Sequence, residues 1–271
     1  MSSWLSITRG DAPLLLSMPH SGIDLQGLEP RLVSPWLARK DADWSIPDLY
    51  TFAHALDATI VRTAISRTVI DVNRDPSGMS LYPGKATTEL CPTTTFDGEP
   101  LYLEGQAPSA DEIAARRANY FDPYQAALRG EIERLRGRHG RVVIYDCHSI
   151  RSSVPRLFEG ALPQFNIGTN EDRACDPGLS AALSSICGRS SFTSVLNGRF
   201  KGGYITRSLG DPARGVHAVQ MELACRGYLR EPAGTTTTDN WPVPFDPFFA
   251  IPLQDVLRRV LQHCLEFASL H

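Results

Sequence analysis

Two short runs of consecutive apolar residues constrain the fold of this sequence more than any other feature. Residues 13–18 (PLLLSM) and 141–145 (RVVIY) do not alternate between apolar and polar positions. Strands of this kind are buried on both faces, which requires helices on both sides of a largely parallel sheet. The sequence therefore predicts an α/β fold, a three-layer α/β/α sandwich with a mixed, largely parallel sheet.

The rest of the chain supplies further strands for such a sandwich. Alternating or β-branched patterns predict four of them, at residues 58–63, 68–72, 204–206 and 215–224. Side chains at every second position of a strand share one face, which here groups Val216, Ala218, Gln220 and Glu222. The fourth strand is therefore expected to carry polar groups at one end of an otherwise apolar face.

Helices and one long connection complete the expected architecture. Apolar residues at helical spacing predict helices at residues 48–56, 111–138, 177–187 and 252–270. Ser109 is the expected N-cap of the second helix. Residues 76–105 are rich in Pro, Gly and Thr and form a long connection, a length often associated with function. We expect a single domain that spans residues 1–271.

Charge and cysteine content narrow the function classes. The formal net charge of −3 gives no general attraction to nucleic acid or to an anionic membrane. No apolar run approaches the roughly 18 residues that would span a bilayer. The six cysteines form no C-x-x-C pair, and the N-terminus lacks the apolar core of a signal peptide. We therefore expect a cytoplasmic protein with free thiols and without a nucleic-acid or membrane partner.

The apolar runs at 13–18 and 141–145 are each followed by a histidine, His20 and His148. Ligands of largely parallel sheets bind beyond the carboxyl ends of the strands, so two imidazoles at this edge could share a metal ion. The alternative for each histidine is a hydrogen-bonded structural role. The spacing alone does not show that the two side chains meet.

A catalytic zinc site takes three protein ligands, so a third donor is needed. The nearby carboxylates are Asp24, Glu29, Asp41 and Asp43. Each of them could instead be a solvated surface charge. The last two also precede a predicted helix, where carboxylates act as caps and first-turn charges.

Glu222 is a carboxylate within an apolar strand, between Met221 and Leu223. Such a group is paired, exposed at an edge, or held in a site that raises its pKa. The last case suits a general base that takes a proton from an attacking water molecule. The alternative is a structural ion pair.

Several arginines lie in segments that favour anion binding. Arg67 and Arg74 flank the predicted strand at 68–72, and Arg199 lies in a glycine-framed loop with Arg207 shortly beyond it. Guanidinium groups bind carboxylates through two parallel hydrogen bonds, and a dicarboxylate would need at least two of them.

Seven sequence motifs occur in the order found in the N-formylglutamate amidohydrolases, and the chain resembles this family over about residues 12–228. The motifs are PLLLSMPHSG, SRTVIDVNR, LYPG with CPTTTFDGEPLY, YDCHSIRS, LFEG with FNIGT, LNGRFKGGYITR, and GVHAVQMELA. The resemblance implies hydrolysis of N-formyl-L-glutamate by water to formate and L-glutamate, the last step of a bacterial route of histidine degradation. It also implies a phosphorylase/hydrolase-like fold similar to that of zinc carboxypeptidases and aspartoacylase.

The resemblance also implies roles for individual residues. One zinc ion per chain would be held by His20, His148 and a carboxylate, with Glu222 as the general base and Arg67 as the group that polarises the carbonyl oxygen. The substrate carboxylates would be bound by the remaining candidates, Asn73 and Arg74 for one and Arg199 with Arg207 or Arg151 for the other.

Two positions depart from the wider pattern. Ile23 stands where aspartoacylase-like enzymes have a glutamate ligand, so the resemblance favours Asp43 as the third ligand, with Asp41 second. Ser45 stands where related deformylases commonly have histidine. Two other functions therefore remain open, a related zinc deacylase for another N-acyl acidic amino acid and a metal-free protein that binds acidic amino acids. The sequence predicts no oligomeric state.

Overall fold

A seven-stranded sheet forms the centre of the protein. The computed structural model describes residues 4–80, 84 and 86–269, and its strand order is β1-β3-β2-β4-β7-β5-β6. The strands are β1 Leu5–Thr8, β2 Leu14–Met18, β3 Thr59–Thr63, β4 Val142–Ile150, β5 Phe165–Gly168, β6 Ser194–Leu196 and β7 Val216–Ala224. β1 runs antiparallel to β3 and β5 antiparallel to β7, while all other neighbours are parallel. The expected mixed, largely parallel sheet is confirmed.

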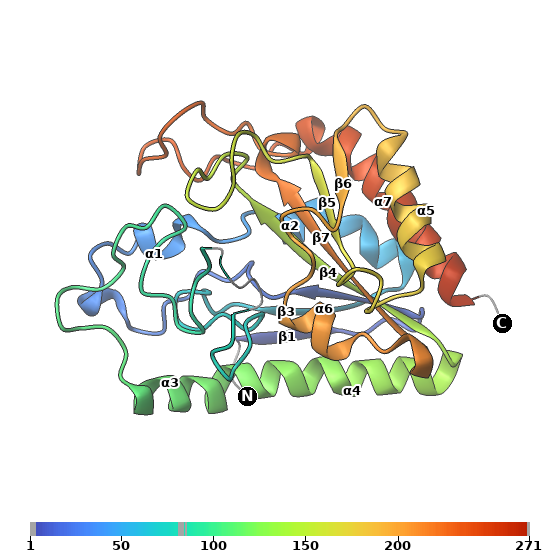
Figure 1. Ribbon diagram of the computed structural model, residues 1–271, viewed down its shortest axis with the longest axis horizontal. Helices are drawn as coiled ribbons and strands as arrows, with labels where there is room; N and C mark the ends of the chain where they lie inside the picture. The colour runs from blue at the N-terminus through green and yellow to red at the C-terminus, as the bar shows by residue number, and fades with distance from the viewer. Residues whose placement is uncertain (1–3, 81–83, 85, 270–271) are drawn as a thin grey trace.

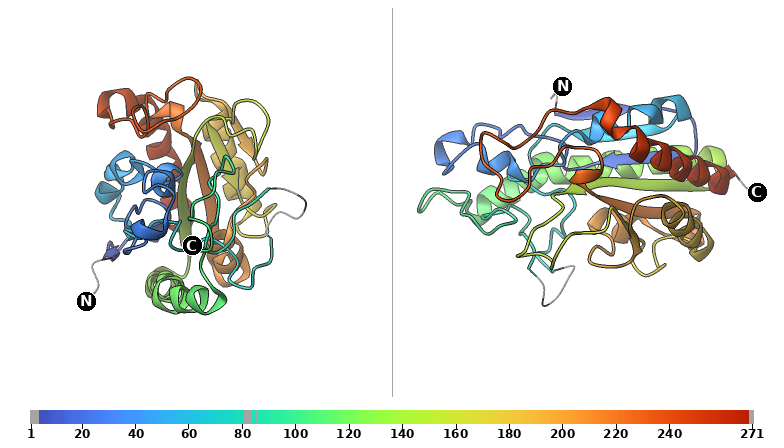
Figure 2. Two further views of the ribbon diagram at one scale, coloured as in Figure 1. Left: turned by 90° about the vertical axis from the view of Figure 1, so that its left-hand side faces the viewer. Right: turned by 90° about the horizontal axis from the view of Figure 1, so that it is seen from above.

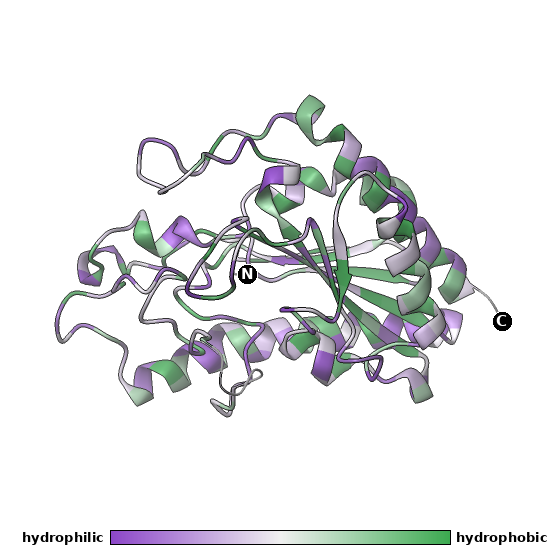
Figure 3. Ribbon diagram, turned by 45° about the horizontal axis from the view of Figure 1, so that its top comes forward, coloured by the Kyte–Doolittle hydropathy of each residue, from purple (hydrophilic) through white to green (hydrophobic). Residues whose placement is uncertain are grey.

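Helices cover both faces of this sheet (Figures 1 and 2). The apolar faces of α4 (Asp122–His139) and α6 (Tyr204–Leu209) pack on one side. The opposite side is covered by α2 (Ile46–Leu49), α5 (Pro177–Gly188) and α7 (Pro247–Ser269). The three-layer α/β/α arrangement therefore follows from the continuously apolar central strands, which need cover on both faces. Figure 3 shows hydrophobic residues concentrated on the central strands.

Short helices lie mainly in the connections. They are α1 (Leu37–Lys40), α3 (Ala110–Arg116), the 3-10 helices Glu29–Arg31, Thr51–Leu56, Pro212–Arg214 and Cys225–Gly227, and the π-helical turn Arg117–Phe121. Ser109 caps α3 as expected, because its side chain accepts a hydrogen bond from the backbone N–H of Glu112.

The central strands β4 and β7 change character along one face. Val142 and Ile144, like Val216 and Ala218 beside them, pack under α4 and α6. Further along the same face, the paired positions become polar, beginning with Asp146 opposite Gln220. The expected alternation in β7 is thus confirmed, and it places a polar surface at the carboxyl end of the sheet.

Two predicted helices have different bounds in the structure. The predicted helix at 48–56 is two short pieces, α2 and the 3-10 helix Thr51–Leu56, because the chain bends at the fully buried Tyr50. The helix predicted from residue 252 begins earlier, at Pro247, since the carboxylate of Asp246 accepts from the backbone N–H groups of Phe248 and Phe249. Its expected end at Leu270 lies outside the described residues.

The strand predicted at 68–72 is wrong. Backbone N–H of Val69 donates to the carbonyl of Ser66, which forms a turn, and the segment joins no sheet. Val69, Ile70 and Val72 are buried in the apolar cluster beneath α4. Their β-branched character therefore reflects burial rather than strand pairing.

The strand predicted at 204–206 is also wrong, because these residues begin α6. The segment is anchored from outside the sheet, since the backbone N–H of Ile205 donates to the side-chain oxygen of Asn73 at 2.8 Å. The strands β1, β5 and β6, which are four, four and three residues long, are not among the predicted strands.

The long connection at 76–105 contains no helix or named strand in its described part. Thr94 and Pro100 form an isolated bridge within it, and Tyr102 pairs with Leu32. Residues 81–83 and 85 of this connection lie outside the described part. All six cysteines are buried and unpaired, in agreement with the expected free thiols. None of the helices described here combines the length and the apolar character needed to cross a membrane.

Candidate active site

The parallel pairing of β2, β4 and β7 brings the candidate residues to one edge of the sheet. His20 follows the end of β2, as expected. His148 lies within β4 rather than beyond it, because the strand continues to Ile150. This corrects the predicted strand end at residue 145. In the register of the sheet His148 lies directly opposite Glu222 of β7, so the two side chains share one face.

His20, Asp43 and His148 form a buried cluster. Their candidate ligand atoms all lie within 4.8 Å of one another. Nδ1 of His148 is 3.1 Å from a carboxylate oxygen of Asp43, and Nδ1 of His20 is 3.7 Å from the same oxygen. The carboxylate of Asp41 points elsewhere, to the guanidinium of Arg151 at 3.1 Å. Of the two aspartates left open by the sequence, Asp43 is the one that joins the histidines.

The far nitrogen of each imidazole is held by a carboxylate that the sequence analysis did not single out. Nε2 of His20 lies 2.7 Å from Asp71, and Nε2 of His148 lies 2.8 Å from Asp146. Such outer carboxylates orient histidine ligands and select the tautomer that presents Nδ1 to a metal ion. The sequence could have indicated both carboxylates. Asp71 lies inside the SRTVIDVNR motif, and Asp146 lies two residues before His148 on the same strand face.

The donor set and its unsatisfied atoms fit a divalent cation. Nδ1 of His20 and Oδ1 of Asp43 are buried and have no hydrogen-bond partner among the described residues. A buried polar atom without a hydrogen-bond partner costs free energy, so these two atoms need an explanation. Two imidazole nitrogens and one carboxylate are a ligand set that suits zinc and leaves a position open.

The two histidines differ in their protonation. Burial lowers the pKa of His148, but the carboxylates of Asp146 and Asp43 outweigh it and hold the pKa well above its usual range. For His20, burial and the adjacent Arg67 lower the pKa, and Asp71 does not fully compensate. The surroundings of the two imidazoles therefore shift their pKa values in opposite directions.

Glu222 carries the properties of a proton-exchanging group. Glu222 is only 8% exposed. Burial, reinforced by the nearby carboxylates of Asp43 and Asp146, raises the pKa of Glu222 to about 8. The positive charges of His148 and Arg67 oppose this rise. A carboxyl group with a pKa near neutrality can both accept and return a proton.

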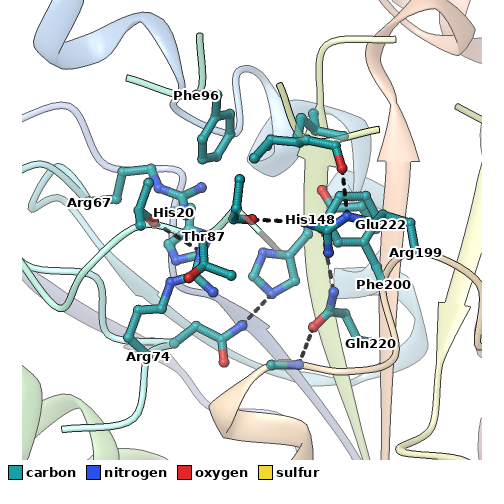
Figure 4. Close-up of a pocket in the computed structure, with 16 residues that line it drawn as sticks. His20, Arg67, Arg74, Thr87, Phe96, His148, Arg199, Phe200, Gln220 and Glu222 are labelled. Atoms are coloured by element: carbon teal, nitrogen blue, oxygen red, sulfur yellow. Dashed lines mark hydrogen bonds between the residues drawn. The ribbon is translucent and has the colours of Figure 1, made fainter. Parts of the chain in front are cut away.

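A cavity opens over the cluster and exposes several of the expected binding residues (Figure 4). Its lining includes His20, His148 and Glu222 together with the cationic or amide side chains of Arg67, Asn73, Arg74 and Arg199. Arg67 donates to Asp71 at 2.7 Å, and its guanidinium lies 3.9 Å from Asp43. The cavity therefore joins the cluster of His20, Asp43 and His148 to a positively charged wall. We call this wall, formed by Arg67, Arg74 and Arg199, the arginine wall.

Arg74 and Arg199 are both held in place on this wall. Arg74 donates to the hydroxyl of Thr88 at 3.0 Å, and its Nε lies 3.4 Å from Asp71. Arg199 donates to the backbone carbonyls of Leu157 and Ala86. These contacts fix the guanidinium groups relative to the connection at 76–105.

Two other expected binding residues do not line this cavity. Arg151 is paired with Asp41 and Asp97, and Arg207 donates to the backbone carbonyl of Gly202. Asn73 does line it, but its amide donates to Asp146 at 3.1 Å and its oxygen accepts from Ile205. The side chain of Asn73 therefore both lines the cavity and links Asp146 of β4 to the start of α6.

Two further positions lie apart from the cavity lining. Ser45 precedes α2 with a left-handed backbone conformation, φ 58°. Cys147 packs in the core on the opposite sheet face, and burial raises its pKa well above the usual range. The thiol between Asp146 and His148 is therefore not part of the cluster.

Comparison with known proteins gives consistent matches over nearly the whole chain. A family model described as N-formylglutamate amidohydrolase matches residues 12–229. The chain is 44% identical over 271 residues to the N-formylglutamate deformylase of Pseudomonas putida, covering 99% of this chain and 98% of that protein. Identity to the N-formylglutamate deformylase of Pseudomonas aeruginosa is 44% over 267 residues, with 98% and 97% covered.

A solved structure supports the fold. The crystal structure of N-formylglutamate amidohydrolase from Ralstonia eutropha JMP134 aligns with a TM-score of 0.75 at 22% sequence identity. The alignment covers 99% of this chain and 98% of that one.

The geometry predicts which aspartate binds the cation. Asp43→Asn should weaken zinc binding by more than the roughly 10- to 100-fold typical of changes to outer partners, because it removes a charged donor from the cluster. Asp41→Asn, the matched control, should leave affinity within about tenfold. Competition with a chromogenic chelator measures both. Loss of zinc binding in the Asp41 variant with retention in the Asp43 variant would reverse the assignment.

The raised pKa of Glu222 predicts a pH-dependent stability difference in chelator-treated protein. The carboxyl ionises near 4.5 when unfolded and near 8 when folded, so the metal-free wild type loses stability as pH rises through this window. Glu222→Gln removes this loss, and its stability relative to wild type should grow from pH 5 to pH 8 in urea unfolding. Glu104→Gln at an exposed position is the control. A difference independent of pH would contradict the burial of an ionising carboxyl.

Proposed function

Because the chain belongs to the N-formylglutamate amidohydrolase family, we propose that it hydrolyses N-formyl-L-glutamate to formate and L-glutamate. The observation that carries the proposal is the buried His20, Asp43 and His148 cluster beside Glu222, in a cavity with an arginine wall. In this role the protein would complete a bacterial route of histidine degradation. The buried free cysteines are consistent with action in the cytoplasm.

We assign one zinc ion per chain to His20, Asp43 and His148. The support is the donor set together with the unpaired Nδ1 of His20 and Oδ1 of Asp43. When bound, such an ion supplies Lewis acidity that makes water a better nucleophile and polarises the acyl oxygen. Asp71 and Asp146 would keep the imidazole rings in the orientation that binds it.

Glu222 would act as the general base and then as the general acid. It accepts a proton from the attacking water, whose oxygen forms a bond to the formyl carbon. It then returns the proton to the amide nitrogen as the carbon–nitrogen bond breaks, leaving formate and the amino group of glutamate. The raised pKa of this buried carboxyl supports both transfers.

Arg67 would stabilise the negative charge that develops on the acyl oxygen. The residue is only 7% exposed, and its guanidinium is held by Asp71 on one side and the ring of Phe96 on the other, 4.6 Å away. A donor fixed in advance needs no rearrangement as the charge develops, and one such donor typically contributes about 3 to 4 kcal/mol.

Arg74 and Arg199 would bind the two carboxylates of the substrate. Both line the cavity and both are fixed by contacts to the surrounding chain. The amide of Asn73 would assist Arg74 from its position beside His148. Arg151 and Arg207 are left out of this assignment, since their guanidinium groups contact residues away from the cavity lining.

The proposal predicts formate release that depends on bound metal. Purified protein with zinc should release formate from N-formyl-L-glutamate, and removal of zinc with dipicolinate should lower the rate about 100-fold or more until zinc is returned. Bound metal without formate release would favour a deacylase for another N-acyl amino acid. Neither metal nor turnover after zinc addition would favour a binding protein for acidic amino acids.

The role of Glu222 predicts a separation of turnover from metal binding. Glu222→Gln should lower kcat by about 10²- to 10⁴-fold, because the amide cannot accept the proton, while zinc content stays at one ion per chain. Glu104→Gln again serves as the control for loss of a carboxylate. Undiminished turnover in the Glu222 variant would remove this residue from the mechanism.

A further inference from the structure

One end of the cavity is apolar and carries no assigned role. Phe96 and Ile150 both line it, with exposed fractions of 7% and 5%, and both belong to one small apolar cluster. Ile150 lies two residues after His148 on the same face of β4, and Phe96 stacks on Arg67. The two apolar side chains therefore border the reacting centre itself.

This apolar end lies away from the Arg74 part of the arginine wall. In Figure 4, Phe96 and Arg74 lie on opposite sides of Arg67 and His20. The other large apolar side chains of the lining, Leu157 and Phe200, are neighbours of Arg199: its Nε bonds the carbonyl of Leu157 and its guanidinium lies 5.3 Å from the Phe200 ring. Leu157 and Phe200 pack against the same small cluster as Phe96 and Ile150 and link that cluster to Arg199, so Phe96 and Ile150 are set apart from Arg74.

The substituents of the reacting carbon can be assigned to these surroundings. In the proposed reaction the oxygen would face Arg67, and the nitrogen would lead to the glutamate moiety, whose carboxylates would lie near Arg74 and Arg199. One substituent remains, which is a hydrogen atom in a formyl group and a methyl group in an acetyl group. Of the large apolar side chains in the lining, Phe96 stacks on Arg67 and Ile150 follows His148 on the same strand face, so these two are the ones beside the reacting centre.

Phe96 is held there by a group of ion pairs in which the cations, Lys40 and Arg151, are buried. It lies in the turn at residues 95–99, whose ends are joined by a hydrogen bond from the backbone N–H of Thr95 to the carbonyl of Glu99. The backbone N–H of Phe96 donates to Asp41 at 2.7 Å. Arg151 bridges Asp41 and Asp97, at 3.1 and 2.7 Å.

A lysine completes this clamp. Nζ of Lys40 lies 2.6 Å from both Asp97 and Glu99, and the residue is only 4% exposed. Both carboxylates are partly exposed, with side chains 27% and 43% exposed, so these pairs contribute mainly through the contacts that they hold. Here the geometry that is held is the position of the Phe96 ring over Arg67. Asp41 and Arg151 thus have a role that neither metal binding nor substrate binding gives them.

We propose that Phe96, backed by Ile150, is the residue that restricts the acyl group to formyl, and that Arg151 is a positioning residue which keeps Phe96 in place. The proposal rests on the proposed function and deepens it. A rigid aromatic wall discriminates by colliding with the larger acyl group, so specificity comes from rejecting acetyl rather than from binding formyl more tightly.

The test compares N-formyl- and N-acetyl-L-glutamate as substrates of the zinc-loaded full chain, with released glutamate as the common readout. Phe96→Ala should raise the ratio of kcat/KM for acetyl over formyl by about tenfold or more, the range expected for one methyl group. Phe96→Leu, a milder change that keeps an apolar side chain at the site, should raise the ratio less. Arg151→Met should shift the ratio in the same direction, which a purely structural role would not do because it would lower both activities equally.

Phe200→Ala is the matched control, since it shortens another aromatic side chain of the same cavity and should leave the ratio unchanged. Suppose that the wild type releases formate and that both Phe96 variants bind zinc. An unchanged ratio of kcat/KM for acetyl over formyl in both variants would then overturn this inference but not the proposed function. An equal shift in the Phe200 variant would also overturn the inference, because the effect would then be general widening. Absence of glutamate release from both substrates by the wild type would overturn the proposed function and this inference together.

Discussion

The parallel register between β4 and β7 is the constraint on which the site depends. It places His148 directly opposite Glu222, so that a ligand-type imidazole and a buried carboxyl share one face and one edge. Since side chains alternate across a strand, a slip of one residue would turn either group into the opposite apolar layer. The apolar residues that precede this pair on the same face pack under α4 and α6, so the polar edge and the apolar core continue one another along both strands.

Compensation of buried charge explains most of what surrounds this pair. Asp71 contacts both His20 and Arg67 at 2.7 Å and also lies 3.4 Å from Arg74. This one carboxylate therefore links the candidate metal ligands to the arginine wall. These contacts hold the pKa of Asp71 well below its usual range despite burial. The atoms left unpaired, Nδ1 of His20 and Oδ1 of Asp43, are those that a cation would satisfy. The site is thus organised for a positive charge at one point and for anions beside it.

A second group of buried charges lies just outside the cavity and does different work. Lys40 and Arg151 secure the turn that carries Phe96, so charges that do not contact the cavity still shape its apolar end. An arginine that lies within a family motif is readily taken for a substrate ligand. The guanidinium of Arg151 instead pairs with the carboxylates of Asp41 and Asp97, outside the cavity lining.

The sequence by itself determined the layered α/β class, the strands β2, β4 and β7, and the residue types at the edge of the sheet. These follow from local pattern, because a strand buried on both faces must be apolar and a polar residue within it requires a reason. Only the tertiary structure brings Asp43 rather than Asp41 beside the histidines, pairs Arg151 and Arg207 with groups outside the cavity lining, and places Asp71 and Asp146 against the imidazoles. Each of these outcomes depends on partners distant in the chain, and no local pattern encodes which carboxylate reaches which cation. The segment at 68–72 shows the same limit for the backbone, since burial beneath α4 selects β-branched residues as effectively as strand pairing does.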